Sequence, residues 1–117
     1  MNKVCLNGRL VKDPELKTTV NGKSLCAFRI AHDIRFGENK KTGFYNITAW
    51  GNHANVIAQY FKTGHEIFIS GRLDYNTWKD QNGGNRSEVS VILEHFDFGS
   101  KPLKTETAKA DAVAPPY

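Results

Sequence analysis

The chain has 117 residues, of which 39% are hydrophobic and 24% are charged, and these values are typical of one globular domain. Lysine and arginine number 16 against 12 acidic residues, a net charge of +4 that favours a polyanionic partner, although an ordinary mixed-charge surface would give the same value. No stretch approaches the roughly 18 apolar residues of a membrane span, and the first residues lack a secretory signal. We therefore expect a soluble cytoplasmic protein, with no role at a membrane.

The two cysteines, Cys5 and Cys26, are far apart and do not have the spacing of a metal or redox motif. Both lie in apolar stretches, so we predict two buried thiols and no disulfide framework.

The first half of the chain reads as three strands. Residues 3–12 alternate apolar and polar side chains around Gly8, a glycine that predicts a bend, and the strand ends at residues 13–15 because Pro14 cannot donate to a ladder. The turn dipeptide 21–22 indicates a hairpin, and residues 24–32 form the second strand. A charged stretch, residues 37–43, is expected to be an exposed hairpin loop that carries Lys40 and Lys41.

The third strand, residues 44–50, has two dissimilar faces. Tyr45, Ile47 and Ala49 suit a core, whereas the other parity alternates aromatic and polar residues: Phe44, Asn46, Thr48 and Trp50. The second set is typical of a wet face that offers rings to a ligand.

One helix and two strands follow. Residues 53–62 repeat apolar side chains at helical spacing, with Asn52 as the expected N-cap and Gly64 as the expected left-handed residue at the end. Residues 66–73 return to alternation, with Gly71 as a second bend, and the extended pattern continues to a glycine-rich turn at 82–85. The last strand is residues 86–94, with Val89, Val91 and Leu93 predicted to face one way.

This order predicts an all-β fold, a five-stranded oligonucleotide-binding (OB) barrel with one helix between strands three and four. We expect the barrel to occupy residues 1–100 and a short disordered tail to occupy residues 101–117.

Sequence motifs for catalysis are missing. The four histidines have no metal-ligand spacing, no serine or cysteine lies in a nucleophile motif, and Gly83-Gly84 is not part of a phosphate-binding loop. We predict a protein that is not an enzyme and needs no metal or cofactor.

Binding of single strands needs rings that stack on bases and cations that track phosphates. Four aromatic residues near strand ends and loops have polar or charged neighbours: Phe36, Phe44, Trp50 and Trp78. For each of them taken alone, a partly buried structural role is an equal alternative. Four more aromatics are expected to be packing residues, namely Phe28, Tyr45, Phe61 and Phe96, whereas the parity of Phe68 leaves its role open.

Several stretches resemble the bacterial single-stranded DNA-binding protein family. These are NKVCLNGRLVKDPELK at 2–17, GKSLCAFRIA, AWGNHANVIAQYFKTGHEIFISGRL at 49–73, and WKDQNGGNR at 78–86. The resemblance covers residues 2–99 and implies that the same four rings stack on bases. It also implies a homotetramer, often formed through the first strands, with roles in DNA replication, recombination and repair. The residues that we expect to contact phosphates are Lys3, Lys17, Arg35, Lys40, Lys41, Lys62, Arg72 and Lys79.

The sequence departs from the family pattern before Trp78, in the loop between the second and third strands, which is short relative to many relatives, and in the tail. The residues before Trp78 read Asp74-Tyr75-Asn76-Thr77 where relatives carry several basic residues, and the tail ends in ADAVAPPY, with Asp111 as its one nearby acid. We therefore expect weak or absent recruitment of replication proteins through the C-terminal tip. An alternative function is an OB-fold primosomal or competence accessory protein that acts mainly through protein partners; an OB-fold nuclease is disfavoured.

Overall fold

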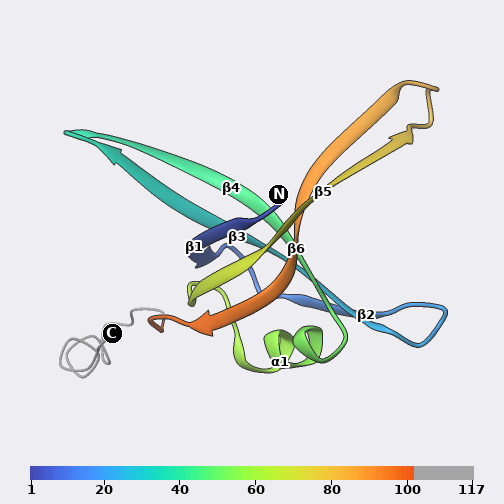
Figure 1. Cartoon of the computed structure of the whole chain (residues 1–117), viewed down its shortest axis with the longest axis horizontal. Coiled ribbons are helices and arrows are strands. Elements are labelled where there is room, and N and C mark those ends of the chain that lie inside the picture. Colours follow the sequence, from blue (N-terminus) through green and yellow to red (C-terminus); the bar gives the residue numbers. More distant parts are fainter. Residues whose placement is uncertain (102–117) are drawn as a thin grey trace.

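The structure, a computed structural model, describes residues 1–101 and consists of a strand barrel with one helix (Figure 1). The strands form a sheet in the order β1-β5-β6-β4-β3-β2, and an additional pairing between β1 and β3 closes a ring of five. The predicted OB-type barrel is confirmed. The expected tail lies outside the described residues from position 102 onward.

The predicted strands are all present, and most of them are longer than predicted. Their bounds are β1 Val4–Leu10, β3 Ser24–Phe36, β4 Asn39–Trp50, β5 Glu66–Lys79 and β6 Asn85–Phe98. The core parity of β4 is confirmed, because Ile47 and Ala49 are buried and Tyr45 is partly buried against them. Val89 shares the parity of the buried Val91 and Leu93 but is itself exposed, because it lies beyond the barrel wall.

One short strand escaped prediction. β2, Glu15–Thr18, pairs with Ser24–Ala27 of β3 across the turn that the dipeptide at 21–22 predicted. All four of its side chains are exposed, so the sequence carries no apolar alternation to reveal it. The helix consequently lies between the fourth and fifth strands of the chain, one strand later than predicted.

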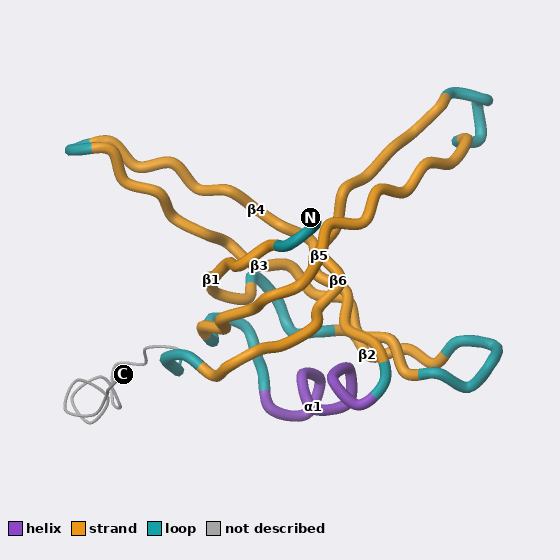
Figure 2. The backbone as a smooth tube through the Cα atoms, viewed as in Figure 1, coloured by secondary structure: helices purple, strands orange, loops and turns teal. Residues whose placement is uncertain are grey.

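Two long hairpins project from the barrel, and we call them the β3–β4 arm and the β5–β6 arm. Figure 2 shows their short turns at the far tips. The loop expected at 37–43 is wrong in its extent. The ladder continues to the pair Phe36–Asn39 and leaves a two-residue turn at 37–38, so Lys40 and Lys41 lie on a strand. Polar side chains hid this segment because both faces of the projecting ribbon are exposed.

The helix α1, Asn52–Tyr60, closes the end of the barrel away from the two arms (Figure 1). The predicted cap is wrong: Gly51 is the N-cap residue, Asn52 is already helical, and no side chain caps the start. Gly64 is left-handed with φ 88°, but it belongs to the following turn, because the helix ends at an extended Phe61. Within residues 1–101, no helix is long and apolar enough to cross a membrane.

The two thiols have different environments. Cys26 is fully buried in the core, and burial raises the pKa of its thiol to about 11. The prediction that Cys5 is buried is wrong. The alternation of β1 directs Val4 and Leu6 towards the core, so the side chain between them points outward.

The two predicted glycine bends are sites where backbones approach closely. β1 changes its main partner from β5 to β3 at Gly8–Arg9, and a Cβ on Gly8 would lie 2.5 Å from the carbonyl oxygen of Ala31. Gly71 follows a bulge between β5 and β6, and a Cβ there would overlap the carbonyl oxygen of Ile92. Only glycine fits these positions without moving a strand.

We expect Gly71→Ala to lower the free energy of unfolding by about 1–3 kcal/mol, because the added methyl group must displace the backbone of β6. Urea unfolding followed by circular dichroism measures the change. Ser70→Ala, one residue earlier, is the control and should stay within about 0.5 kcal/mol of the parent. Equal stability of the Gly71 variant and this control would contradict the close approach.

Candidate nucleic-acid interface

The outward-facing side of β3 and β4 carries two exposed rings. The core residues of β4 have odd numbers, so the even positions Phe44 and Trp50 point away from the barrel interior, 53% and 42% exposed. Phe44 lies opposite Ala31 and Trp50 opposite Leu25. The guanidinium carbon of Arg29 lies 5.0 Å from the centre of the Phe44 ring, a cation–π contact that places a positive charge beside it.

An open groove of about 610 Å³ lies between these two rings along the strand. Its floor is the outer side of β3 and β4, including Ala27, Arg29, Asn46 and Thr48. One wall is the β5–β6 arm, whose Glu88 accepts a 3.0 Å hydrogen bond from the Asn46 amide, and the opposite wall comes from residues near β2. The groove is therefore a concave surface with mixed charge and a ring beyond each end of its floor.

Trp78 extends this surface onto the β5–β6 arm. It is 47% exposed and pairs with Arg86, on the face that also carries the groove residues Asn76 and Glu88. We call these four residues, Asn76, Trp78, Glu88 and Arg86, the Trp78 face.

Phe36 lies apart from the other three rings. It is 61% exposed near the tip of the β3–β4 arm, where it pairs with Asn39. Its even number on β3 gives it the parity of the core residues Phe28 and Ile30, so it projects from the opposite side of the ribbon to Phe44. The fold thus gathers three predicted rings near one groove and leaves the fourth on the other side of an arm. The predicted packing aromatics Phe28, Tyr45, Phe61 and Phe96 are buried or partly buried, and Phe68 is 39% exposed.

The eight predicted phosphate contacts are spread over the molecule. Arg35, Lys40 and Lys41 lie on the β3–β4 arm, where Lys40 is 3.7 Å from Asp33. The remaining residues occupy separate elements: Lys79 ends β5, Lys17 lies on β2 and is 3.9 Å from Glu15, Lys62 follows α1 at the end away from the arms, and Lys3 and Arg72 share one acid.

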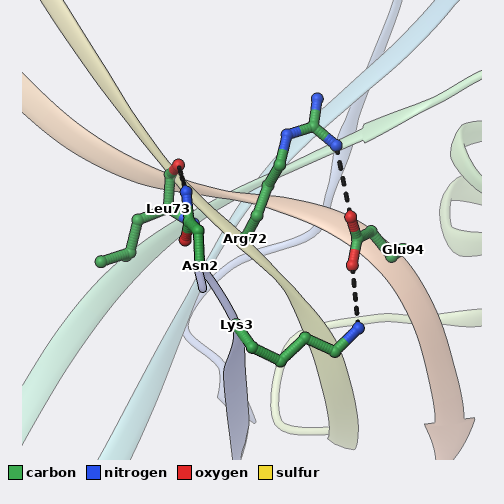
Figure 3. Close-up of polar contacts among 5 residues, drawn as sticks. All are labelled: Asn2, Lys3, Arg72, Leu73 and Glu94. Carbon is green, nitrogen blue, oxygen red and sulfur yellow. Dashed lines mark hydrogen bonds and ion pairs between the residues drawn. The ribbon is translucent and has the colours of Figure 1, made fainter.

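That acid is Glu94, the unpaired residue of the β6 bulge opposite Ser70 and Gly71. Figure 3 shows its carboxylate between the two cations, with Oε1 3.1 Å from Lys3 Nζ and Oε2 3.4 Å from Arg72 Nη1. The hydrogen bond from Lys3, together with both positive charges, lowers the pKa of Glu94. The neighbouring Asn2 side chain fastens this end of the chain, because it exchanges two hydrogen bonds with the backbone of Leu73.

Arg72 belongs to the groove side of the sheet. A row of paired residues crosses four strands from Ala27 through Thr48 and Ile92 to Arg72. Glu94 therefore neutralises a cation that would otherwise face a polyanion on this surface.

We expect Glu94→Gln to tighten the binding of oligo-dT by about 2- to 10-fold, because Lys3 and Arg72 then contact phosphates without first breaking an ion pair with Glu94. The slope of log affinity against log salt should steepen by up to about 1.4, which is about 0.7 for each of these two cations once it neutralises a phosphate. Fluorescence anisotropy of a labelled oligonucleotide at several salt concentrations measures both values.

Asp97→Asn is the matched control, since it removes one negative charge from the same strand but leaves Lys3 and Arg72 paired with Glu94. An identical affinity and slope for the two variants would mean that only net charge matters, and would contradict the role given to Glu94.

Two arginines of the site were absent from the predicted set. Arg29 lies at the same register as Asn46 and lines the groove, a position that the alternation of β3 could have revealed. Arg86 lies opposite Trp78, and its Nε donates to Asp80 at 3.1 Å. The same Asp80 accepts hydrogen bonds from the backbone of Asn82 and Gly84. The Asp80 carboxylate thus fixes both the tip of the β5–β6 arm and Arg86, and no local sequence motif predicts this contact.

The histidines of the described region have structural contacts. His32 Nδ1 lies 2.7 Å from the carbonyl oxygen of Asn7, and His65 Nδ1 accepts a hydrogen bond from the backbone of Lys62. Residues 1–101 contain no group of three or more histidine, cysteine or acidic side chains that could hold a metal ion.

An OB barrel with exposed rings around a groove on its outer wall has the architecture of the oligonucleotide-binding fold class. Comparison with known families agrees, because the model of the single-strand binding protein family matches residues 1–99. The chain belongs to that family.

Three relatives illustrate the similarity. Single-stranded DNA-binding protein 1 of Chlorobaculum tepidum is 34% identical over 98 residues, 80% of this chain and 60% of that protein. The single-stranded DNA-binding protein of Fusobacterium nucleatum is 35% identical over 117 residues, 96% of this chain and 75% of the relative. Single-stranded DNA-binding protein 1 of Clostridium acetobutylicum is 36% identical over 103 residues, 84% and 93% respectively. The chain thus spans less than two thirds of the length of the first of these relatives.

Proposed function

We propose that this protein binds single-stranded DNA, largely without regard to sequence, and performs no catalysis. The observation that carries the proposal is the outer side of β4, where Phe44 and Trp50 stand exposed on either side of a groove while the alternate residues anchor the strand in the core. A base has a flat face whatever its identity, so rings held in this way bind single strands of any sequence, each contributing about 1–3 kcal/mol. Membership of the family and the names of the relatives support the same ligand.

In this proposal the stacking rings are Phe36, Phe44, Trp50 and Trp78, and the eight predicted cations contact phosphates, with Arg29 and Arg86 as additional contacts. Such a protein would coat single strands exposed during replication, recombination and repair, and would act in the cytoplasm on the DNA of the nucleoid. No metal or cofactor takes part.

We also propose that the chain forms a homotetramer through its first strands. Within the described residues, β1 pairs with β5 along Val4–Arg9 but meets β3 only at Arg9 and Leu10, so the other edge of Val4–Leu6 has no strand partner. Such an edge is suited to pairing with a second copy. Light scattering of the free protein should give the mass of four chains, and a monomer mass at micromolar concentration would reject this assembly.

Titration with oligo-dT, followed through tryptophan fluorescence, tests the binding proposal. We expect quenching, because both tryptophans of the chain are proposed stacking rings. A duplex of equal length should quench far less. Unchanged fluorescence with oligo-dT at low salt, combined with capture of replication proteins, would instead favour the accessory-protein alternative.

A further inference from the structure

The β5–β6 arm has a second face, formed by the residues that alternate with those of the Trp78 face. Three cross-strand pairs of this face lie beyond the barrel wall: Tyr75 with Val89, Thr77 with Ser87, and Lys79 with Asn85. We call these six residues the Tyr75 face. Because side chains alternate along a strand, Tyr75 and Trp78 project from opposite sides of the same ribbon.

Tyr75 is 66% exposed, more than any of the four rings assigned to stacking. Its ladder partner Val89 is also exposed, and within the described part of the chain the Tyr75 side chain makes no hydrogen bond or ring contact. Exposed aromatic surface next to exposed aliphatic surface is unfavourable in water and is typical of a binding surface.

The Tyr75 face is also hollowed. A depression of about 480 Å³ is lined by five of its residues, Tyr75, Thr77, Lys79, Asn85 and Ser87, and by Trp78 and Arg86. The ring therefore stands at a concave site with polar groups around it, as a stacking platform requires.

The charges on this face favour a polyanion. Lys79 is the one charged residue of the six, and it has no ion-pair partner among residues 1–101. On the Trp78 face, by contrast, Arg86 is bound to Asp80 and Glu88 adds a negative charge. A second copy of the arm would bring like charges together, whereas a nucleic-acid strand supplies both a flat base and a phosphate.

We propose that the Tyr75 face is a second binding surface for single-stranded DNA, on which Tyr75 stacks against a base and Lys79 contacts the neighbouring phosphate. This inference rests on the proposed function and extends it: a strand bound to the Trp78 face passes around the arm and continues on the reverse side. Lys79 then contacts a phosphate next to the base stacked on Tyr75, not one next to a base stacked on Trp78.

Site-specific fluorescence tests the inference. In a chain carrying Trp50→Phe and Trp78→Phe, which keep the rings, Tyr75→Trp provides the only indole, and saturating oligo-dT of about 30 nucleotides should quench it. Tyr60→Trp in the same background is the control, because Tyr60 is 55% exposed but lies on α1 with its ring edge-on to Phe98 at 6.3 Å. Quenching of neither reporter, or equal quenching of both, would overturn the assignment of Tyr75.

Affinity measurements separate this inference from the proposed function. Tyr75→Ala should weaken oligo-dT binding about 5- to 150-fold, Tyr75→Phe should retain most of it, and Lys79→Ala should reduce the salt slope by about 0.7. If the parent binds oligo-dT and Trp50→Ala weakens it while Tyr75→Ala binds like the parent, only the second surface is rejected. If the parent does not bind, both proposals fail. A fall in assembly mass of Tyr75→Ala with unchanged DNA affinity would identify the face as an interface between copies and overturn the inference.

Discussion

Replacing Trp50 and Trp78 together by alanine is expected to weaken the binding of oligo-dT by about 2–6 kcal/mol. Each ring contributes about 1–3 kcal/mol when it stacks on a base, and the two lie on different strands, so their contributions should add. Both side chains are about half exposed, so the barrel should remain folded without them. Anisotropy of a labelled oligonucleotide gives the affinities, and circular dichroism verifies the fold.

The control keeps the flat surface and changes only its size. Trp50→Phe with Trp78→Phe should retain most of the affinity, because phenylalanine offers a smaller ring at the same positions. A double alanine variant that binds as tightly as the parent would contradict the stacking assignment, and an equal loss in both double variants would show that the indole itself, rather than any ring, is needed.

The largest expected effect on stability is that of Phe61→Ala, which should lower the free energy of unfolding by about 3–5 kcal/mol. Phe61 is fully buried where α1 meets the barrel. Its ring stacks on Phe98 at 4.8 Å and meets the edge of Phe96 at 5.8 Å. Removing the Phe61 ring would leave a cavity between α1 and the barrel. The loss is large because the whole free energy of unfolding of a domain of this size is only about 5–15 kcal/mol. Urea unfolding followed by circular dichroism measures the difference.

Tyr60→Ala is the neighbouring control, since that ring is exposed at the last residue of α1 and touches only Phe98 among the described rings. It should cost about 1 kcal/mol or less. Equal losses for the two variants would contradict the packing described for Phe61. Oligo-dT affinity of the folded fraction should fall far less in either variant than in the double tryptophan variant, because neither residue is a proposed stacking ring and the helix lies at the end of the barrel away from the arms (Figure 1).

Alternation carried most of the information that the sequence held about the fold. In β4 the same seven residues gave the buried set and the exposed set, so the positions of Phe44 and Trp50 could be predicted before any geometry was known. Gly8 and Gly71 also had a local signature, and both mark sites where another strand's backbone leaves no room for a side chain.

Segments without one buried face could not be predicted in the same way. β2 and the outer halves of the two hairpins are exposed on both sides, so no hydrophobic pattern distinguishes their strands from loops. The reach of Asn39–Gly43 as a strand depends on hydrogen bonds to β3, which polar side chains neither favour nor forbid. The short turn at the tip was hidden for the same reason.

The charges of the site depended on contacts between distant residues. Glu94 holds Lys3 from 91 positions away, and it does so because a bulge leaves it unpaired on β6. Counting cations along the sequence could not show that two of the predicted phosphate contacts share an acid. Nor could it show that Phe36 would lie on the other side of its arm from Phe44, since that required the length of β3 to be known.

The affinity of the protein for three labelled ligands of equal length, across a series of salt concentrations, tests the central claim most directly. The ligands are oligo-dT, a mixed-sequence single strand, and the duplex of that sequence. We predict that both single strands bind with similar affinity, that the duplex binds far more weakly, and that affinity for the single strands falls as salt rises. Binding of the duplex as tightly as its single strand, or no binding of either single strand at low salt, would contradict the account.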